Sequence, residues 1–357
     1  MKILIDIGHP AHVHYFKNFI KIMEAKGHDF LVFARDKEVS LDLLHKYGID
    51  FKSRGKGPKS LFGKIFYALR VDIYIFKLAR KWNPDILLSF GSPYAAHISK
   101  LIGKPHIALT DTEHARLIIL AFAPFTETII TPDCYYKDFI DKQIRFKGYF
   151  ELSYLSPKYF TPNQFIKQEL NINENQKVVL FRFISWGASH DIGQTGISTN
   201  KKNKLIELFL SKGYKVLISA EGAMTSDLES YRIKIAPDKI HDVLNAVDIF
   251  IGESGTMATE AAVLGTPSIY VNSLDAGVFQ DEIKYKILYS FRNSDNIISK
   301  IDAILAEPNL KEIHQKRKEK MLTDKIDFTS FLVWFIENYP KSKETMKKNS
   351  DYQYKFK

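Results

Sequence analysis

Short apolar runs alternate with helix-like segments along almost the whole chain. In the first half these runs are KILIDI, HDFLVFA, DILLS, PHIAL and ETIIT, and KVVLFRF, YKVLISA, VDIFIG and TPSIYV repeat the scheme in the second half. The runs lack regular polar alternation, which is typical of strands that are buried on both faces of a parallel sheet. The pattern therefore predicts an α/β protein with two doubly wound, Rossmann-like domains.

The length of the chain and its loop-rich middle predict where the two domains meet. A chain of 357 residues suits two domains of common size. The stretch from Gly148 to Gln176 holds Pro157, Pro162 and the polar run NINENQ, so we place the boundary within it. We predict a first domain at 1–150, a linker region at 151–176, a second domain at 177–340 and a basic tail at 341–357, of which KKNSDYQYKFK, residues 347–357, is expected to be mobile.

Cysteine content and hydropathy predict the compartment. Cys134 is the only cysteine, which excludes an internal disulfide framework and fits a reducing environment. The start MKILIDIGHP lacks the basic segment and apolar core of a signal peptide. No apolar run reaches the roughly 20 residues that a membrane span needs. We therefore expect a cytoplasmic protein.

The net charge of +10 is concentrated in two segments. Between Lys52 and Lys81, nine basic residues accompany a single acidic residue, Asp72, and the tail from Lys341 carries six lysines against two acidic residues. Residues 58–82 have the pattern of a helix, with Leu61, Ile65, Leu69, Ile73 and Phe76 at the spacing of a face packed on a core. Three aromatic residues, Phe62, Phe66 and Tyr67, are expected on the basic outer surface.

A basic and aromatic surface over residues 56–82 suits an anionic membrane surface on the cytoplasmic side. A solvated basic helix without a partner explains the same residues. No nucleic-acid-binding module accompanies the charge, so we do not expect nucleic acid as a partner.

The turn GESGT, residues 252–256, follows one predicted strand and opens a predicted helix. Unpaired N–H groups and a positive helix dipole favour a phosphate at such a point. Gly255 would let the main chain approach a ligand, Ser254 and Thr256 add hydroxyl donors, and Glu260 is placed to accept hydrogen bonds from ribose hydroxyls. We predict a nucleotide-sugar site here, although an ordinary capped turn with Glu260 in solvent explains the same residues.

Three histidines, His9, His12 and His14, follow the first predicted strand, where doubly wound sheets bind their ligands. Their spacing does not match a helical metal pair and no Cys or His cluster follows, so we expect no metal. We predict His12 as a general base or as the group that orients an acceptor hydroxyl, with His9 in the same cleft. Turn and helix-capping roles explain one or two of these histidines equally well.

Polar residues follow two further strands at this edge. Asp111 and Glu113, with His114 beside them, come directly after PHIAL and would supply a catalytic base and its orienting partner. Helix capping by Asp111 explains these residues as well. The loop FGSPYAAH, residues 90–97, brings Ser92 to the same edge.

The first loop of the second half, in VVLFRFISWGASHDIG, is the fourth candidate segment. Arg182 would pair with a diphosphate through its guanidinium fork. Ser185 lies beside it, and Trp186 would stack on a base or sugar or anchor the domains structurally. His190 is a further candidate for the cleft.

With these residues in hand, the chain resembles the GT-B superfamily, which has two Rossmann-like domains facing across a cleft. The superfamily includes sugar-nucleotide-dependent glycosyltransferases and the UDP-N-acetylglucosamine 2-epimerases. The chain is most similar to a prokaryotic family of this scaffold known only as a domain of unknown function, over roughly Met1 to Glu307. The matching stretches are DIGHPAHVHYFK, SFGSPYAAHISKLIGKPHIALTDTEHA, GYFELSYLSP, RFISWGASHDIG and FIGESGTMATEAAVLGTPSIYV.

The resemblance implies roles for particular residues. Ser254, Gly255 and Thr256 look like the superfamily's diphosphate-binding turn, and Glu260 looks like its ribose-binding carboxylate. The lipid-carrier N-acetylglucosamine transferase of peptidoglycan synthesis has a similar turn, but GHPAHVH replaces its glycine-rich acceptor loop here.

These observations together predict a metal-independent glycosyltransferase that uses a nucleotide-activated sugar, expected to be UDP-linked, in surface polysaccharide or glycan assembly. The nucleotide-sugar is a substrate, so no cofactor is expected, and a lipid-linked or glycan acceptor is the expected second substrate. An epimerase or hydrolase of a UDP-sugar is the alternative. A non-catalytic nucleotide-sugar-binding subunit is the third interpretation.

Overall fold

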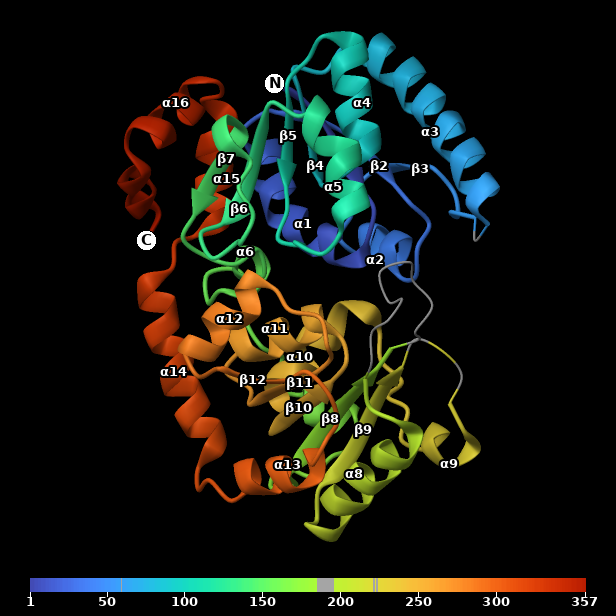
Figure 1. The fold of residues 1–357 in the computed structure, drawn as a ribbon, viewed down its shortest axis with the longest axis vertical. Coiled ribbons are helices and arrows are strands. Elements are labelled where there is room, and N and C mark those ends of the chain that lie inside the picture. The colour runs from blue at the N-terminus through green and yellow to red at the C-terminus, as the bar shows by residue number, and fades with distance from the viewer. Residues whose placement is uncertain (59, 185–195, 221, 223) are drawn as a thin grey trace. The chain divides into compact units, whose positions relative to one another are not determined.

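The computed structural model describes residues 1–58, 60–184, 196–220, 222 and 224–357. These residues form two compact units (Figure 1). The first unit consists of Met1–Tyr154 with Lys325–Lys357, and the second consists of Leu155–Asp324. Each unit is built on one parallel sheet with helices against it, which confirms the predicted α/β class and the two Rossmann-like domains.

The first unit contains a seven-stranded sheet in the order β3-β2-β1-β4-β5-β6-β7. The chain starts in the middle of the sheet, adds β2 and β3 on one side, and returns to add β4 on the other side. Ile5 of β1 accordingly lies opposite Val32 of β2 and Leu88 of β4. The strands are β1 (Lys2–Ile7), β2 (Asp29–Ala34), β3 (Phe51–Ser53), β4 (Ile86–Phe90), β5 (His106–Leu109), β6 (Thr128–Pro132) and β7 (Gln143–Phe146).

Helices cover this sheet, and the first one begins earlier than its apolar pattern suggests. The helix α1 (Pro10–Ala25) starts at Pro10 because proline fits the first helical position and His9 caps the helix from outside. The other helices of the first unit are α2 (Ser40–Lys46), α3 (Leu61–Trp82), α4 (Pro93–Ile102), α5 (Arg116–Phe122), α15 (Phe328–Glu337) and α16 (Lys341–Lys348).

The second unit contains a five-stranded sheet in the order β12-β11-β10-β8-β9. Its strands are β8 (Val178–Phe183), β9 (Lys215–Ala220), β10 (Ile249–Gly252), β11 (Ser268–Val271) and β12 (Leu288–Phe291). The helices used below are α7 (Ile166–Glu169), α8 (Thr199–Ser211), α10 (Ile240–Ala246), α11 (Gly255–Val263), α12 (Gly277–Lys284), α13 (Ile297–Leu305) and α14 (Leu310–Asp324).

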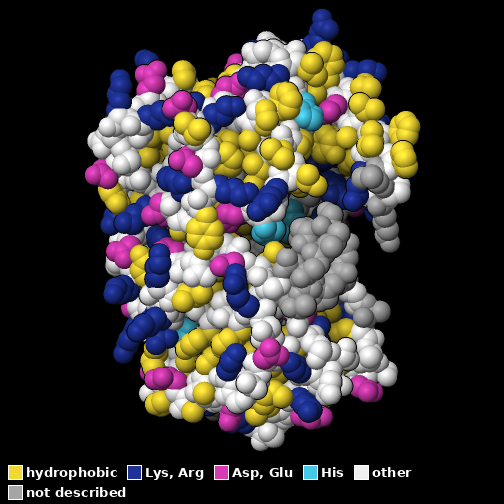
Figure 2. Space-filling model, viewed as in Figure 1, with side chains coloured by type: hydrophobic (Ala, Val, Ile, Leu, Met, Phe, Trp, Pro, Cys, Tyr) yellow, Lys and Arg dark blue, Asp and Glu magenta, His cyan; other side chains and the backbone are white. Residues whose placement is uncertain are grey.

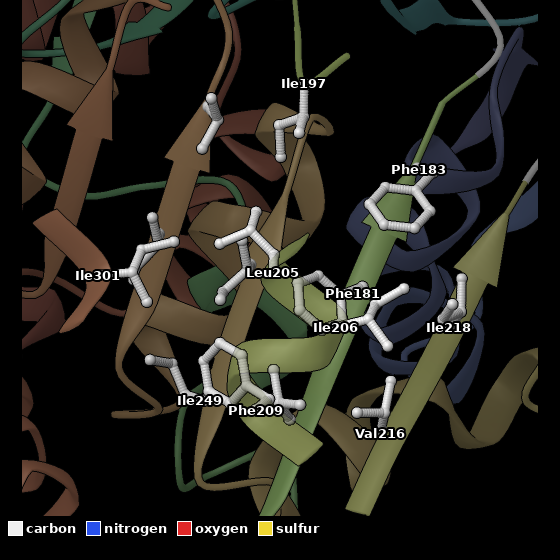
Figure 3. Packing of buried hydrophobic residues seen from close by; sticks show 14 of the residues in the cluster. Phe181, Phe183, Ile197, Leu205, Ile206, Phe209, Val216, Ile218, Ile249 and Ile301 are labelled. Carbon is white, nitrogen blue, oxygen red and sulfur yellow. The ribbon is translucent and has the colours of Figure 1, made fainter. Parts of the chain in front are cut away.

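The core of the second unit lies between its sheet and α8 (Figure 3). The ring of Phe181 on β8 meets the ring of Phe209 on α8 edge to face, with centroids 5.7 Å apart. Both side chains are fully buried, and β-branched residues of β9 and β10 surround them. This packing fixes β8, whose carboxyl end carries the candidate site.

The carboxyl-terminal residues correct the predicted domain limits. We predicted that the second domain extends to residue 340, but residues 325–357 belong to the first unit. The cause is aromatic packing, because Phe328 of α15 lies 4.3 Å from Phe146 of β7 and 5.0 Å from Phe150, measured between ring centroids.

The structure also corrects our prediction for the basic tail at 341–357, whose end at 347–357 we expected to be mobile. The tail forms α16 and a short 3-10 helix, η4 (Ser350–Phe356). The ring of Tyr352 stacks on Trp334 of α15 at 4.7 Å, and the side chain of Gln353 accepts a hydrogen bond from the backbone of Lys147. Residues that read as a lysine-rich tail therefore contribute their aromatic side chains to the first unit.

The helix α3 forms where it was predicted, but the face expected to pack on the core is wrong. The side chains of Ile65, Leu69 and Ile73 are exposed. A second apolar stripe at four-residue spacing packs against the sheet instead, and helical periodicity alone cannot choose between two apolar stripes. The buried stripe consists of Tyr67, Val71, Ile75 and Ala79.

The exposed stripe is part of a larger apolar surface on the first unit. Phe62 and Phe66 of α3 are 78% and 72% exposed, and Leu117 of α5 is 82% exposed. Both α3 and α5 contact α4, and Figure 2 shows hydrophobic side chains gathered over this group of helices. We call this surface the apolar face; its residues are Phe62, Ile65, Phe66, Leu69 and Ile73 of α3 with Leu117, Ile118 and Leu120 of α5.

Among the described residues, no helix combines the length and the apolar content that crossing a membrane requires.

Candidate functional site

The order of the second sheet places a ligand crevice at the carboxyl ends of β8 and β10. The chain runs from β8 outward to β9 and then crosses back to β10 on the other side of β8. In open parallel sheets, ligands bind at the carboxyl edge where the strand order reverses in this way. Gly252, the last residue of β10, is paired with Arg182 of β8, so the turn after β10 begins directly beside Arg182.

The helix α11 begins at this crevice with its first amide groups uncapped by a side chain. Ser254 is the N-cap residue, but its hydroxyl makes no capping hydrogen bond, and the first turn contains no acidic residue. Ser254, Gly255 and Thr256 are partly exposed. Because the first N–H groups of a helix have no partner within it, these amides and the positive helix end are suited to bind an anion.

Two glycines make the turn fit its surroundings. A Cβ atom on Gly255 would lie 2.6 Å from the Cζ atom of Phe279 on α12. A Cβ atom on Gly252 would lie 2.9 Å from the Cβ atom of Arg182. Close packing within the protein therefore explains both glycines, and the ring of Phe279 lies beside the first residue of α11.

Glu253 is the central residue of this turn, and the sequence analysis gave it no role. Its carboxylate is fully buried and accepts hydrogen bonds from the backbone N–H groups of Ile184, at 3.2 Å, and Ile197, at 2.8 Å. Lys202 of α8 forms an ion pair with it at 3.1 Å. An acidic residue between a strand-ending glycine and a serine N-cap was the available signal, because such a carboxylate can anchor the neighbouring loop.

Glu260 lies on α11 beyond this turn and is only 4% exposed. Its Oε1 atom is 3.0 Å from the Nε2 atom of His241, which belongs to α10 and is also buried. The alternative prediction, with Glu260 on a solvated face, is therefore wrong. The predicted contact with ribose hydroxyls stays a prediction.

Arg182 lies at the carboxyl end of β8, as predicted, and is partly buried. Its Nη1 atom donates a hydrogen bond to the hydroxyl of Ser219 on β9 at 2.9 Å. The other predicted residues of this loop, Ser185, Trp186 and His190, lie outside the described residues.

In the first unit, the strand order reverses between β1 and β4, and the predicted histidines lie beside this point. His9 caps α1, where its Nδ1 atom accepts a hydrogen bond from the backbone of Ala11 at 3.2 Å. His12 accepts a hydrogen bond at its own Nδ1 atom from the backbone of Gly8, also at 3.2 Å.

Burial lowers the pKa of His12 well below 6.5, and the nearby His9, Lys37 and Arg54 lower it further. His12 is therefore neutral, and because Nδ1 accepts from Gly8, the ring proton is on Nε2. In this tautomer the remaining nitrogen is a donor. The geometry thus favours the second of the two predicted roles, in which His12 orients an oxygen atom, over that of a general base.

Ser92 caps α4 where the strand order reverses between β1 and β4, and it connects the end of β4 to the buried ion pair of Asp6 and Arg54. Its hydroxyl donates a hydrogen bond to Asp6 of β1, and the other oxygen of Asp6 lies 2.9 Å from the Nε atom of Arg54. Asp6 and Arg54 are both buried, and burial raises the pKa of Asp6 although Arg54 and Ser92 oppose the rise. Ser92 thus helps to hold the strand ends together.

Asp111 and Glu113 lie at the carboxyl end of β5, as predicted. Burial raises the pKa of Asp111 to about 7; a hydrogen bond from Thr112 opposes the rise and the neighbouring Glu113 adds to it. Glu113 is buried and accepts a hydrogen bond from the backbone of Tyr136 at 3.2 Å, whereas His114 is exposed. Asp111 is therefore the residue whose pKa best suits a general acid or base near neutral pH.

The predicted residues thus fall on the carboxyl edges of two separate sheets. Arg182, the GESGT turn and Glu260 are on the second sheet, and the histidines, Ser92 and the acidic pair are on the first. In the described part of the chain, no group of three His, Cys, Asp or Glu residues is placed to hold a metal ion.

Comparisons with known proteins identify relatives of the chain by sequence. The model of the family described as "Protein of unknown function (DUF354)" matches residues 1–341. The uncharacterized protein MJ0665 of Methanocaldococcus jannaschii is 28% identical over 283 residues, which cover 75% of this chain and 81% of that protein.

Solved structures share the fold. UDP-GlcNAc 2-epimerase from Neisseria meningitidis, bound to UDP-GlcNAc, superimposes with a TM-score of 0.66 at 14% identity and covers 88% of this chain and 94% of its own. The Streptomyces sp. SF2575 glycosyltransferase SsfS6 gives 0.59 at 14% identity, with 95% and 100% of the two chains covered. These likenesses confirm the predicted fold with two Rossmann-like domains.

The raised pKa of Asp111 predicts a specific dependence of stability on pH. The folded protein holds the proton up to about pH 7, whereas the unfolded chain releases it near the ordinary value of 3.8. The stabilising contribution is therefore complete below about pH 4 and is lost as the pH rises through about 7. We therefore expect the wild type to lose stability relative to Asp111→Asn between about pH 4 and about pH 7. Denaturant titrations of both proteins measure this difference in the free energy of unfolding. A difference that does not change over this pH range would contradict the assignment.

Proposed function

The chain belongs to the DUF354 family, and from that premise we propose that it is a metal-independent glycosyltransferase of the GT-B type. Its donor would be a UDP-activated sugar and its product a surface polysaccharide or glycan. The uncapped start of α11, beside Arg182 at the reversal point of the second sheet, is the observation that carries this proposal. The nucleotide-sugar enzymes that share the fold support it.

In this proposal the second unit binds the donor. The diphosphate lies against the first amides of α11, Ser254 and Thr256 add hydroxyl donors, and Arg182 offers a guanidinium group. Positive charge at this point stabilises the departing UDP, so the protein need not supply a metal. Glu260 would turn toward the ribose, with His241 as the group that holds its carboxylate in place.

The first unit binds the acceptor in this proposal. Asp111 is the proposed base, because its pKa of about 7 allows it to accept a proton from a hydroxyl at neutral pH. His12 would donate a hydrogen bond from Nε2 to an acceptor oxygen, and Glu113 would raise the basicity of Asp111. This assignment replaces His12 as the preferred base.

A UDP-sugar 2-epimerase or hydrolase is the second candidate. It is favoured by the similarity to the Neisseria meningitidis UDP-GlcNAc 2-epimerase, whose structure contains UDP-GlcNAc. Acidic residues with raised pKa values would also suit the proton transfers of such a reaction. A non-catalytic nucleotide-sugar-binding subunit remains the third interpretation.

Incubation of the purified protein with UDP-GlcNAc separates these functions. For a transferase, we expect the sugar nucleotide to stay intact when no acceptor is present, and UDP to be released only when a membrane lipid extract is added. Chromatography and proton NMR of the nucleotide fraction would follow both outcomes. Epimerised or hydrolysed sugar in the absence of the extract would contradict transfer and support the alternative.

Replacement of Glu260 tests the donor site. We expect Glu260→Ala to weaken the binding of UDP by about 1–3 kcal/mol, because a charged hydrogen-bonding group would be lost. Isothermal titration calorimetry measures this effect, with the exposed Glu207→Ala on α8 as the control. Thermal unfolding of both variants shows whether the pairing with His241 matters for the fold. Unchanged affinity in a folded Glu260→Ala variant would refute the ribose contact.

We also propose that residues 56–82 attach the protein to an anionic membrane surface, where a lipid-linked acceptor would be found. The apolar face is the observation that supports this attachment, since large contiguous apolar patches mark interaction sites. Asp72 is the only acidic residue of α3, and its Oδ2 atom lies 3.1 Å from the Nδ1 atom of His97 on α4. The basic residues of α3 therefore border the apolar face without an acidic competitor on the same helix.

Phospholipid vesicles that contain phosphatidylglycerol test this attachment. We expect the double variant Phe62→Ser, Phe66→Ser to lose at least about tenfold in vesicle affinity, because two large side chains no longer enter the lipid. Added salt should weaken the binding of the wild type, since it screens the basic residues. Phe165→Ser, at a position in the second unit that is 63% exposed, is the matched control. Equal sedimentation of both variants with the vesicles would exclude the apolar face as the attachment surface.

A further inference from the structure

Five basic side chains gather where β1, β2 and β3 end. Arg35 follows β2 and Arg54 follows β3, and the backbone N–H group of each donates to the neighbouring strand at 2.9 Å, to Ile7 and Ala34 respectively. The strands are parallel, so these loops lie on one edge of the sheet. We call this group the basic corner; it consists of Arg35, Lys37, Arg54, Lys56 and Arg70.

Three of the five charges have an acidic partner. Arg54 is paired with the buried Asp6, and the Nζ atom of Lys37 lies 3.3 Å from the Oε1 atom of Glu38. The Nζ atom of Lys56 lies 3.9 Å from the Oδ2 atom of Asp36, but the side chain of Lys56 is 82% exposed. This ion pair is therefore weak, and Lys56 can bind another anion instead.

Arg35 and Arg70 have no acidic partner among the residues that the structure describes. The Nε atom of Arg35 is buried and has no hydrogen-bond partner among these residues. Arg70 donates one hydrogen bond, to the carbonyl oxygen of Arg54 at 3.2 Å. A buried N–H group on a charged guanidinium is costly without an acceptor, and the Nε atom of Arg35 is such a group, whereas the guanidinium of Arg70 is exposed.

Both guanidinium groups lie against one short loop, Gly55-Lys56-Gly57. A Cβ atom on Gly55 would lie 3.4 Å from the Nη2 atom of Arg70, and a side chain on Gly57 would overlap the guanidinium of Arg35. Lys56 stands between the two glycines. The loop therefore brings two guanidinium forks and one ammonium group together, which is a donor set suited to a phosphate dianion.

The basic corner adjoins the apolar face. Arg70 belongs to α3, and Tyr67, on the same helix, donates a hydrogen bond to the carbonyl oxygen of Gly55 at 3.2 Å. Phe66 precedes Arg70 by one helical turn and is exposed. A ligand with its phosphate in the corner would thus have an apolar surface beside it.

We propose that Arg35, Lys56 and Arg70 bind the phosphate of a lipid-linked acceptor, whose hydrocarbon chain lies along the apolar face of α3. The identification of this ligand as an acceptor rests on the proposed function. The site itself rests on the unpaired guanidinium groups and on the loop that holds them. It belongs to the first unit and is separate from the anion site at α11.

Calorimetry with farnesyl phosphate tests the site in the full-length protein. Saturating UDP is present to occupy the donor site. We expect saturable binding, a loss of about tenfold in affinity for Arg35→Gln and for Arg70→Gln, and a smaller loss for Lys56→Gln. Arg80→Gln, on the exposed surface of the same helix, is the matched control and should bind like the wild type. Farnesol, which lacks the phosphate, should bind with similar affinity to all variants.

Several outcomes would overturn the proposal. Unchanged affinity in Lys56→Gln and Arg70→Gln would exclude the corner, and these exposed side chains can be replaced even if Arg35→Gln does not fold. Glucose 1-phosphate that binds as tightly as farnesyl phosphate would exclude a lipid-linked ligand. If UDP does not bind while farnesyl phosphate binds in an Arg35-dependent manner, the proposed transfer reaction fails and the basic corner stands.

Discussion

The ligand edge of the second sheet depends on one buried carboxylate, that of Glu253. An isolated carboxylate in this position would be strongly disfavoured, because burial removes its hydration. The charge is tolerated because Lys202 and two backbone N–H groups, from Ile184 and Ile197, converge on it. The same carboxylate therefore connects the residue after β8 and residue 197 to the turn that precedes α11. The start of α11 is thus held by a buried acid whose charge is compensated by Lys202 and by backbone N–H groups.

The sequence predicted the architecture well because its strands are nearly uniform in apolar character. It missed β3, β7 and β12, three short strands at the sheet edges whose sequences, FKS, QIRF and LYSF, contain polar residues. Edge strands are shielded on one side only, so their composition differs from that of central strands. The helix α3 shows a second limit, since two apolar stripes at helical spacing cannot be ranked without knowing which one meets the sheet.

The candidate residues were predictable to the extent that they follow strands. Arg182, Ser92 and Asp111 lie at strand ends, as their position in the sequence suggested. Their chemistry depended on partners far away in the chain, which no local pattern reveals. The hydrogen bond from Ser92 to Asp6 crosses 86 positions of sequence, and the hydrogen bond from Arg182 to Ser219 crosses 37. The role of Glu253 was missed for the same reason.

Basic and acidic side chains lie at different strands along the carboxyl edge of the first sheet. This separation suggests how the protein would bind an acceptor. The basic corner lies at β1, β2 and β3, His12 and Ser92 lie at the reversal point between β1 and β4, and Asp111 and Glu113 lie at β5. Neighbouring strands are about 4.8 Å apart, so β2 and β5 are separated by about 14 Å. In the proposed complex, an acceptor with its phosphate in the basic corner would extend along this edge toward Asp111, the proposed base. The distance between the strands would also keep a phosphate in the basic corner away from the carboxylates of Asp111 and Glu113, so that these negative charges would not repel each other.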